Sequence, residues 1–370
     1  MIKDKKSLKV SKLPSRRKFF KTAAVTGVAA VAASSLSAPA VAKERVEASM
    51  VATWPRDFPG LGTGAQRLAQ RLSDMSDGRI QVTYYAANER VKAFDSFDEV
   101  ASGNSQMYHG ADYYWVKKHP AFGYFTASPF GFTYAEMNAW LKFGGGQELW
   151  DELTDDFGTQ SFAAGNTGVQ MGGWFNKQIN SVNDLKGLKM RIPGLGGEVL
   201  SRAGGVPVTL AGSEIFTALQ TGVIDATEWV GPYNDRAFGL HKAAKYYYYP
   251  GWHEPGPTIE CIINKKAYNS LPEDLQLIVD VACKAANIDM LSDYTAKNNL
   301  ALQFLKSKKI EILKFPDEVL LKLKNLSKEI LVEISKSDAI TQEVYNSYSK
   351  FSSAVSPWTK ISDKAYLDIR

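Results

Sequence analysis

Residues 180–193 read NSVNDLKGLKMRIP and bring one arginine, Arg191, to the end of a strand-like run. Ser181 and Gly187 are typical of the start and end of a short capped helix, which precedes that run. The planar guanidinium of a lone arginine after a strand suits a two-point grip on a small carboxylate. The stretch therefore predicts an α/β fold that presents Arg191 to a small anion.

Polar residues elsewhere in the chain complicate this anion site. Gln170, the pair Glu228–Trp229 and Glu254 all fall in the region around Arg191. Two carboxylates near a bound anion would each repel it by about 4 kcal/mol, at about 4 Å and an effective dielectric constant of about 20. Either these acids lie elsewhere, or a positive group lies between them and the ligand.

Helical and strand patterns alternate on both sides of this stretch. From Gly60 the apolar positions recur at helical spacing as far as 77–78, and a strand pattern follows at 79–85. A helix at 94–102 and a strand at 106–111 repeat the order, which is the rhythm of an α/β domain with a largely parallel sheet. Further helices are predicted at 134–143, at 147–157 and from Ser213, and further strands at 161–164, 169–175, 226–230 and 258–264.

The C-terminal part is predicted to be helical. A helix is predicted from Leu271 to about Lys306. It has proline and acids in its first turn and no glycine or proline after that turn. At about 1.5 Å per residue, this helix is long enough to cross two lobes. The tail from Pro316 is rich in Lys and Glu and carries leucines at helical spacing. That pattern fits a surface helix or a helix that docks on a second subunit; the leucines are Leu320, Leu323, Leu326 and Leu331.

The N-terminus is typical of a twin-arginine export signal. It reads SRRKFFK at 15–21, continues with an apolar, small-residue run and ends in Ala-Val-Ala at 40–42. We expect cleavage near Ala42 and a periplasmic location; a retained N-terminal anchor is the alternative. Residues 1–42 hold nine basic residues and one acid, so their removal changes the formal charge from +5 to −3. The basic balance therefore gives no argument for nucleic-acid binding.

Two cysteines, Cys261 and Cys283, remain after cleavage. An oxidising compartment permits a disulfide between them, but their apolar surroundings equally suit buried free thiols. Neither their number nor their spacing indicates a zinc or redox motif. The sequence leaves the two states open.

Three blocks of sequence resemble the substrate-binding proteins of tripartite ATP-independent periplasmic (TRAP) transporters. They are DLKGLKMRIP at 184–193, EIFTALQTGVIDA at 214–226, and NKK at 264–266 followed by LPEDLQ at 271–276. The resemblance covers nearly all of the mature chain. It implies a two-lobed fold of the periplasmic-binding-protein type (type II-like), with a ligand cleft between the α/β lobes and a long helix spanning both.

The resemblance also implies a division of the chain. After the signal peptide at 1–42, we expect the first part of lobe I at 43–165 and lobe II at 166–256. Residues 257–306 are expected to return to lobe I and form the spanning helix. Residues 307–370 are then C-terminal helices. The resemblance implies that they form the interface of a helix-exchanging dimer.

Two shorter motifs resemble one branch of that family. EWVGPY at 228–233 and GWHE at 251–254 are similar to the branch that binds 2-oxo or 2-hydroxy monocarboxylates together with a metal ion. The resemblance implies that Arg191 forms a salt bridge with the substrate carboxylate. It implies that a sodium or calcium ion, which prefers oxygen ligands, is held by Gln170, Glu228, the Trp229 carbonyl and Glu254.

The remaining contacts with ligand are expected from Gln170 and from aromatic residues. Tyr113 or Tyr114 would face the ligand from the other lobe, and Trp229 would pack against its short apolar end. His253 and the tyrosines at 246–249 are expected to pack the crossover strand instead. The implied partners are a small organic acid anion, the membrane permease subunits of a TRAP transporter and, in a homodimer, a second copy.

Two other functions compete with this interpretation. A dicarboxylate or sugar acid held by Arg191 without metal is the first alternative. A periplasmic enzyme exported by the twin-arginine route is the more remote one, and we expect no enzyme. No Gly-x-Ser-x-Gly motif occurs, and the Gly60-x-Gly62-x-x-Ala65 sequence follows a proline where a dinucleotide fold needs a strand. The histidines are scattered rather than paired at ligand spacing: His109, His119, His241 and His253.

Overall fold

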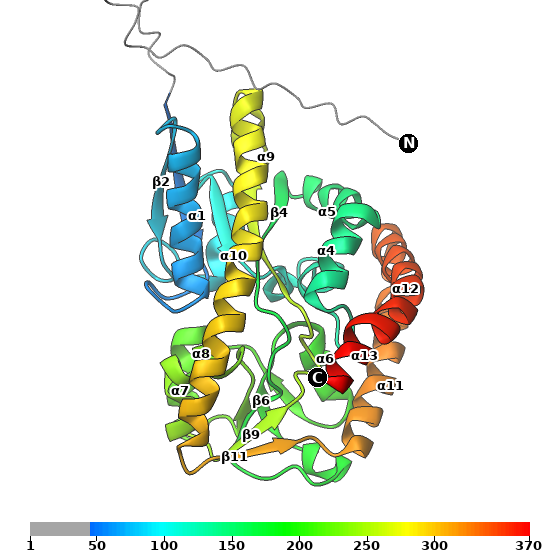
Figure 1. Cartoon of the computed structure of the whole chain (residues 1–370). Coiled ribbons are helices and arrows are strands. Elements are labelled where there is room, and N and C mark those ends of the chain that lie inside the picture. Colours follow the sequence, from blue (N-terminus) through cyan, green and yellow to red (C-terminus); the bar gives the residue numbers. More distant parts are fainter. Residues whose placement is uncertain (1–44) are drawn as a thin grey trace, which may run out of the picture. The chain divides into compact units, whose positions relative to one another are not determined.

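Two mixed sheets organise residues 45–370, the part of the chain that the computed structural model describes (Figure 1). The predicted export signal at 1–42 lies outside the described residues. The first sheet has the order β2-β1-β3-β10-β4 and the second the order β11-β9-β5-β8-β6-β7. We call the parts built around them the first and the second lobe. Helices flank both sheets, so the predicted two-lobed α/β fold is confirmed.

The first sheet is only partly parallel. Strand β1 pairs in parallel with β2 and β3, but β10 runs antiparallel to both β3 and β4. Strands β2, β1, β3 and β4 thus run in one direction, as predicted, and β10 is the exception, because it is the strand by which the chain returns from the second lobe. The bounds are β1 Val46–Ala52, β2 Ile80–Tyr85, β3 Met107–Gly110, β4 Thr159–Asn166 and β10 Thr258–Asn264.

The second sheet is made of short strands. Strand β6, which ends in Arg191, lies between β7 and β8 and is parallel to both. Strand β5 is antiparallel to β8 and β9, and β11 is parallel to β9. The bounds are β5 Gly173–Phe175, β6 Lys189–Arg191, β7 Val206–Val208, β8 Ala226–Thr227, β9 Tyr246–Tyr249 and β11 Glu311–Lys314.

Most predicted helices are present within a residue or two of their expected ends. The predicted short capped helix is the 3-10 helix η4, Val182–Leu185, where the Asp184 carboxylate accepts the Ser181 N–H at 2.8 Å. The α-helices are α1 Leu61–Met75, α2 Ser96–Ala101, α3 Phe122–Thr126, α4 Tyr134–Phe143, α5 Gly146–Asp155, α6 Gly194–Arg202, α7 Gly212–Gln220, α8 Pro232–Phe238, α9 Lys265–Asn269, α10 Glu273–Lys306, α11 Asp317–Ile334, α12 Ala339–Thr359 and α13 Ala365–Ile369.

The long helix α10 connects the two lobes, as predicted. Its 34 residues include no glycine or proline, and Glu273 and Asp274 in the first turn favour its start. Leu275, Val279 and Tyr294 are among the residues it buries. Figure 1 shows α10 passing alongside α1 of the first lobe and α8 of the second, and it contacts both.

Two further segments cross between the lobes, and one of them was predicted in part as a strand. Residues 167–172 connect β4 to β5, and residues 250–257 connect β9 to β10. The predicted strand at 169–175 is therefore reduced to its last three residues. The predicted strand at 226–230 is reduced to its first two, because the chain leaves the sheet there: the Met171 N–H donates to the Val230 carbonyl at 3.0 Å.

The C-terminal tail adds a strand and packs on its own chain. Strand β11 joins the second sheet, whereas the sequence indicated only helices after 306. The reason is that α10 ends beside β9, where the next residues can pair. On α11, Leu323 and Leu326 are buried in the core of the second lobe. The predicted leucine face is thus already covered within this chain.

The two cysteines are free and buried. Of the two states that the sequence left open, the structure has the reduced one. Within residues 45–370, no helix combines the length and the apolar character needed to span a bilayer.

Candidate functional site

The two crossover segments are joined to each other by their backbones. The Gln170 N–H donates to the Glu254 carbonyl at 3.2 Å, and the Gly251 N–H donates to the Gln170 carbonyl at 2.9 Å. This pairing brings the side chains together, and the Gln170 Nε2 donates to Glu254 Oε2 at 2.7 Å. Both side chains are buried. Two residues 84 positions apart in the sequence therefore form one polar surface where the lobes meet.

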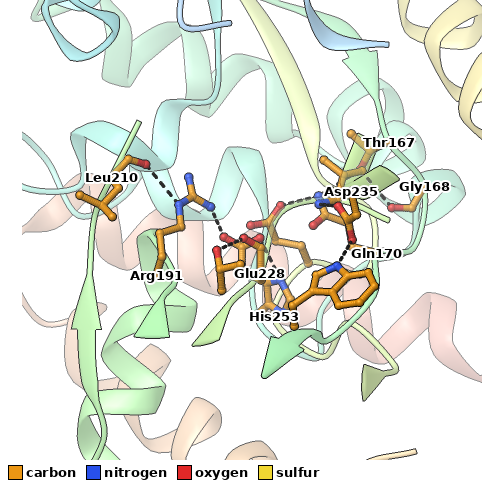
Figure 2. Close-up of polar contacts among 12 residues, drawn as sticks. Thr167, Gly168, Gln170, Arg191, Leu210, Glu228, Asp235 and His253 are labelled. Atoms are coloured by element: carbon orange, nitrogen blue, oxygen red, sulfur yellow. Dashed lines mark hydrogen bonds and ion pairs between the residues drawn. The ribbon is translucent and has the colours of Figure 1, made fainter. Parts of the chain in front are cut away.

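Arg191 and Glu228 meet because their strands are neighbours. Arg191 is opposite Thr227 in the β6–β8 register, and the Glu228 N–H donates to the Arg191 carbonyl at 3.1 Å. The Arg191 Nη1 and Glu228 Oε1 form an ion pair in which both side chains are almost completely buried (Figure 2). Arg191 Nε also donates to the Leu210 carbonyl at 3.2 Å.

This ion pair supplies a positive group for one of the two acids, Glu228. The positive group beside Glu228 is Arg191 itself. Burial lowers the pKa of the guanidinium, but Glu228, Tyr114 and Tyr113 together outweigh that effect and keep its pKa above the ordinary value. Removing either partner of such a buried pair leaves an uncompensated charge, which costs about 3–5 kcal/mol.

Glu254 supplies a second carboxylate without a cation of its own. Burial raises its pKa well above the usual value, the nearby Glu228 carboxylate raises it further, and Arg191 opposes the rise. Glu228, His253 and Glu254 each place one donor atom within 4.8 Å of the others. The site thus holds more acid than Arg191 alone can balance.

His253 contacts an acid of the site, and the sequence reasoning did not include this contact. Its Nε2 lies 3.3 Å from Glu228 Oε2, and its side chain is 1% exposed. The expectation that His253 packs the crossover strand rather than touching ligand stays a prediction. Its place beside Glu254 in the sequence was the available signal, since both belong to the 250–257 crossover.

Aromatic side chains close the site from both lobes. The 3-10 helix η3, Asp112–Trp115, carries Tyr113 and Tyr114 from the first lobe. The Arg191 Nη2 lies 3.4 Å from the Tyr114 hydroxyl. Gly194, with φ of 61°, leaves the space in which Tyr113 packs, because a Cβ there would lie 2.9 Å from the Tyr113 Cβ. The Trp229 ring lies under the guanidinium at 5.0 Å.

A residue that the sequence did not single out anchors the Glu228 segment. Asp235 in the first turn of α8 accepts the Tyr247 hydroxyl at 2.6 Å and the Trp174 Nε1–H at 3.0 Å. Its other oxygen faces the Val230 N–H at 3.4 Å. Burial raises the pKa of Asp235 to about 7. These contacts fix the chain just after Trp229.

Several buried polar atoms of the site have no hydrogen-bond partner within the described residues. They are Gln170 Oε1, Glu228 Oε2, Trp229 Nε1 and both ring nitrogens of His253. Buried polar atoms are normally paired, so a group of unpaired ones indicates a place for a ligand. The unpaired amide and carboxylate oxygens are the donors that hard cations such as sodium or calcium prefer. The residues present therefore fit such an ion.

Comparison with known proteins gives a consistent result. The model of the family described as bacterial extracellular solute-binding protein, family 7, matches residues 50–338. A relative from Nostoc sp., the monocarboxylate 2-oxoacid-binding periplasmic protein, is 39% identical over 355 residues, which cover 95% of this chain and 97% of the relative.

Two solved structures of TRAP periplasmic solute-binding proteins are similar over nearly their whole length. The one from Pseudoalteromonas atlantica, with bound sodium and pyruvate, is 44% identical, has a TM-score of 0.85, and aligns over 88% of this chain and 99% of its own. The one from Colwellia psychrerythraea, with bound calcium and pyruvate, is 43% identical, has a TM-score of 0.86, and aligns over 88% of this chain and 100% of its own. The chain belongs to this family: it is a periplasmic solute-binding protein of a TRAP transporter, a transport receptor and not an enzyme.

Proposed function

We propose that this receptor captures a small 2-oxo or 2-hydroxy monocarboxylate of the pyruvate or lactate class, together with a sodium or calcium ion. The observation that carries the proposal is the excess of buried acid at one arginine. Arg191 is paired with Glu228, Glu254 lies beside them, and Gln170 Oε1 and Glu228 Oε2 are unpaired. An anion can join such a site only if a cation accompanies it. Similar proteins with bound pyruvate and sodium or calcium support this choice.

The chain's residues would divide the two charges between them. Arg191 would hold the ligand carboxylate through the guanidinium edge that faces Tyr114. The oxygens of Gln170, Glu228 and Glu254, with the Trp229 carbonyl, would hold the cation. When bound, the cation supplies the positive charge that these acids require. Tyr113 and Tyr114 would cover the ligand from the first lobe, and the Trp229 ring would pack against its short apolar end.

Ligand binding at this place would favour the closed arrangement of the lobes. The site draws Tyr113 from the first lobe, Arg191 from the second, and Gln170 and Glu254 from the two crossovers. A ligand that contacts all three regions binds the closed state more tightly than an open one and shifts the population toward it. The membrane permease would then recognise the closed receptor and take the ligand from it.

Thermal unfolding of the mature protein tests this function. A ligand that binds only the folded state raises the melting temperature. We would compare pyruvate, lactate, longer 2-oxo acids, succinate and a sugar acid in calcium, in sodium, and in a potassium buffer with chelator. Pyruvate or lactate should stabilise the protein only with calcium or sodium. Full stabilisation by succinate or a sugar acid in chelator, with no response to pyruvate or lactate, would instead support the metal-free alternative.

Export and self-association are also part of the proposal. Residues 1–42 would direct twin-arginine export and be removed near Ala42, which mass spectrometry of the periplasmic protein would test. A homodimer would form through the end of the tail rather than through the buried leucines of α11. The exposed apolar side chains there are Trp358, Ile361, Tyr366, Leu367 and Ile369. Light scattering of the full mature chain and of a chain ending at Ser356 would test the dimer.

A further inference from the structure

His253 is buried in the site without a clear role in the proposed function. Its side chain is 1% exposed, and neither ring nitrogen has a hydrogen-bond partner within the described residues. Gly196 of α6 packs against the His253 Cβ, since a Cβ at Gly196 would lie 3.0 Å from it, and the Trp252 ring lies edge-on with 5.5 Å between the ring centroids. In this buried position the imidazole Nε2 lies 3.3 Å from Glu228 Oε2.

The Glu228 carboxylate lies between two donors. Its Oε1 is paired with Arg191. Its Oε2 lies 3.3 Å from His253 Nε2 and accepts no hydrogen bond (Figure 2). Among the described residues, Arg191 and His253 are the basic side chains within 4 Å of this carboxylate. The orientation of this carboxylate therefore depends on Arg191 at one oxygen and on His253 at the other.

The chemistry of the site decides between two roles for the imidazole. A ring nitrogen can be a metal ligand, but nitrogen ligands suit zinc, copper or nickel, whereas sodium and calcium take oxygen. The other donors, Gln170 Oε1, Glu228 Oε2 and Glu254, are all oxygens. An imidazole Nε2 at 3.3 Å from a carboxylate that would hold a metal matches the common arrangement in which outer groups orient the ligands.

We propose that His253 is a positioning residue for cation binding: its Nε2–H holds Glu228 Oε2, so that Glu228 serves Arg191 with one oxygen and keeps a fixed face toward the cation. This rests on the proposed function, because it assigns a role within the same site. His253 touches neither the cation nor the organic acid. Its effect on the ligand acts through Glu228 alone.

The test uses the mature protein and three variants. His253→Leu removes the donor, His253→Gln keeps an N–H donor of similar reach, and His241→Leu is the matched control at a histidine that packs on Phe304 outside the site. Calcium affinity is measured by calorimetry, and terbium, which replaces calcium, is followed by luminescence excited through tryptophan. Loss of an outer group of this kind weakens metal affinity about 10- to 100-fold. We expect that loss in His253→Leu, and calcium affinity within about fivefold of the wild type in the other two variants.

Two further measurements separate positioning from direct contact. At saturating calcium, pyruvate affinity of His253→Leu should return to within a few-fold of the wild type. In a double-mutant cycle, His253→Leu should add little to Glu228→Gln, because both changes act on the same carboxylate. If the leucine variant does not fold, His253→Asn, whose amide is too short to reach Glu228, takes its place.

The opposite results are equally clear. Unchanged calcium affinity in His253→Leu, loss in His253→Gln equal to that in His253→Leu, or additive effects with Glu228→Gln would each overturn the proposal. So would zinc binding to the wild type that exceeds calcium binding and is lost in both His253 variants, since that would make the imidazole a ligand. If the wild type itself binds no pyruvate with calcium or sodium, the proposed function fails first.

Discussion

Two pairs of buried carboxylates in this chain differ in how their oxygens are satisfied. Asp112 and Glu260 lie in the core of the first lobe, and Glu228 and Glu254 lie where the crossovers meet. Burial raises the pKa of Asp112 to about 7 and that of Glu254 well above its usual value. Burial of acid alone therefore does not distinguish a structural pair from a binding site.

The first pair is supplied with neutral donors at every oxygen. Asp112 accepts the Tyr108 hydroxyl at 2.7 Å and the Trp150 Nε1–H at 3.0 Å. Glu260 accepts the Thr126 hydroxyl at 2.7 Å and the Asp112 N–H at 3.0 Å. This network fixes η3, which carries Tyr113 and Tyr114. It leaves no carboxylate oxygen of the first pair unpaired for a ligand to bind.

In the second pair, the Arg191 guanidinium is the positive partner, and some of the polar oxygens have no hydrogen bond. Glu228 has Arg191 at one oxygen and no hydrogen bond at the other, and Gln170 reaches Glu254 with its amide nitrogen while its own oxygen is unpaired. An unpaired buried acceptor costs about 1–3 kcal/mol, more when charged, and a protein retains it only where something else compensates. The unpaired oxygens of the second pair therefore indicate that the ligand site is there and not at the first pair.

Replacing Arg191 with alanine should have the largest effect. Glu228 would be left buried and unpaired, so the free energy of unfolding should fall by about 3–5 kcal/mol. Pyruvate affinity should fall by more than about a hundredfold, because the carboxylate grip is lost with it. Chemical denaturation and calorimetry would measure the two losses.

An exposed arginine provides the control for that experiment. Arg202 pairs with Glu333 at 3.0 Å on the surface of the second lobe. Its replacement by alanine should leave both stability and pyruvate affinity almost unchanged, because an exposed ion pair contributes little. If Arg191→Ala behaved like Arg202→Ala, Arg191 would have no special place in the site.

Replacing Glu254 with glutamine should separate binding from stability. The amide keeps a carbonyl oxygen for Gln170 but removes one of two neighbouring buried charges. The ligand-free protein should therefore be at least as stable as the wild type, while calcium affinity should fall about 10- to 100-fold. Melting temperatures without ligand, together with calcium titrations, would show this opposition. A clear loss of stability without loss of calcium affinity would mean that Glu254 is structural.

The same change in the first lobe should give the reverse result. In Glu260→Gln, one of the donors, the Thr126 hydroxyl or the Asp112 N–H, would face an NH₂ group instead of an oxygen. The free energy of unfolding should fall by about 1–3 kcal/mol. Calcium affinity should be unchanged, because every oxygen of this pair already has a protein partner. If Glu260→Gln weakened calcium binding under conditions where the variant is fully folded, the first pair could no longer be treated as purely structural.

The elements that follow a simple repeat could be predicted from the sequence. Helices α1 and α10 and strand β10 have a sustained apolar pattern, so their bounds were found closely. The crossover at 167–172 could not be told from a strand, because it continues directly into β5 while its Met171 N–H pairs with the Val230 carbonyl outside the two sheets. The antiparallel return of β10 also depends on the path between lobes, which periodicity does not report.

The residues of the site could be named, but not their pairing. Arg191 and Glu228 are neighbours because β6 lies beside β8 in one register, and no local pattern specifies that register. His253 was assigned to the packing of the crossover strand, and no local pattern places its ring beside Glu228. Only the backbone pairing of the two crossovers shows that the same turn carries both Glu254 and His253 into the site.

The smallest expected effect on ligand affinity concerns two tyrosine hydroxyls, that of Tyr114 beside Arg191 and that of Tyr108, which donates to Asp112. Tyr114→Phe removes the oxygen 3.4 Å from Arg191 Nη2, a long bond, so pyruvate affinity should fall only about three- to tenfold and stability little. Tyr108→Phe removes the hydroxyl that Asp112 accepts at 2.7 Å, so stability should fall by about 1–3 kcal/mol with pyruvate affinity unchanged. Each protein would be titrated with pyruvate at saturating calcium and unfolded with urea. A larger affinity loss in Tyr108→Phe than in Tyr114→Phe would show that the first pair controls the ligand through η3, and the two pairs would then have to be treated as one connected site.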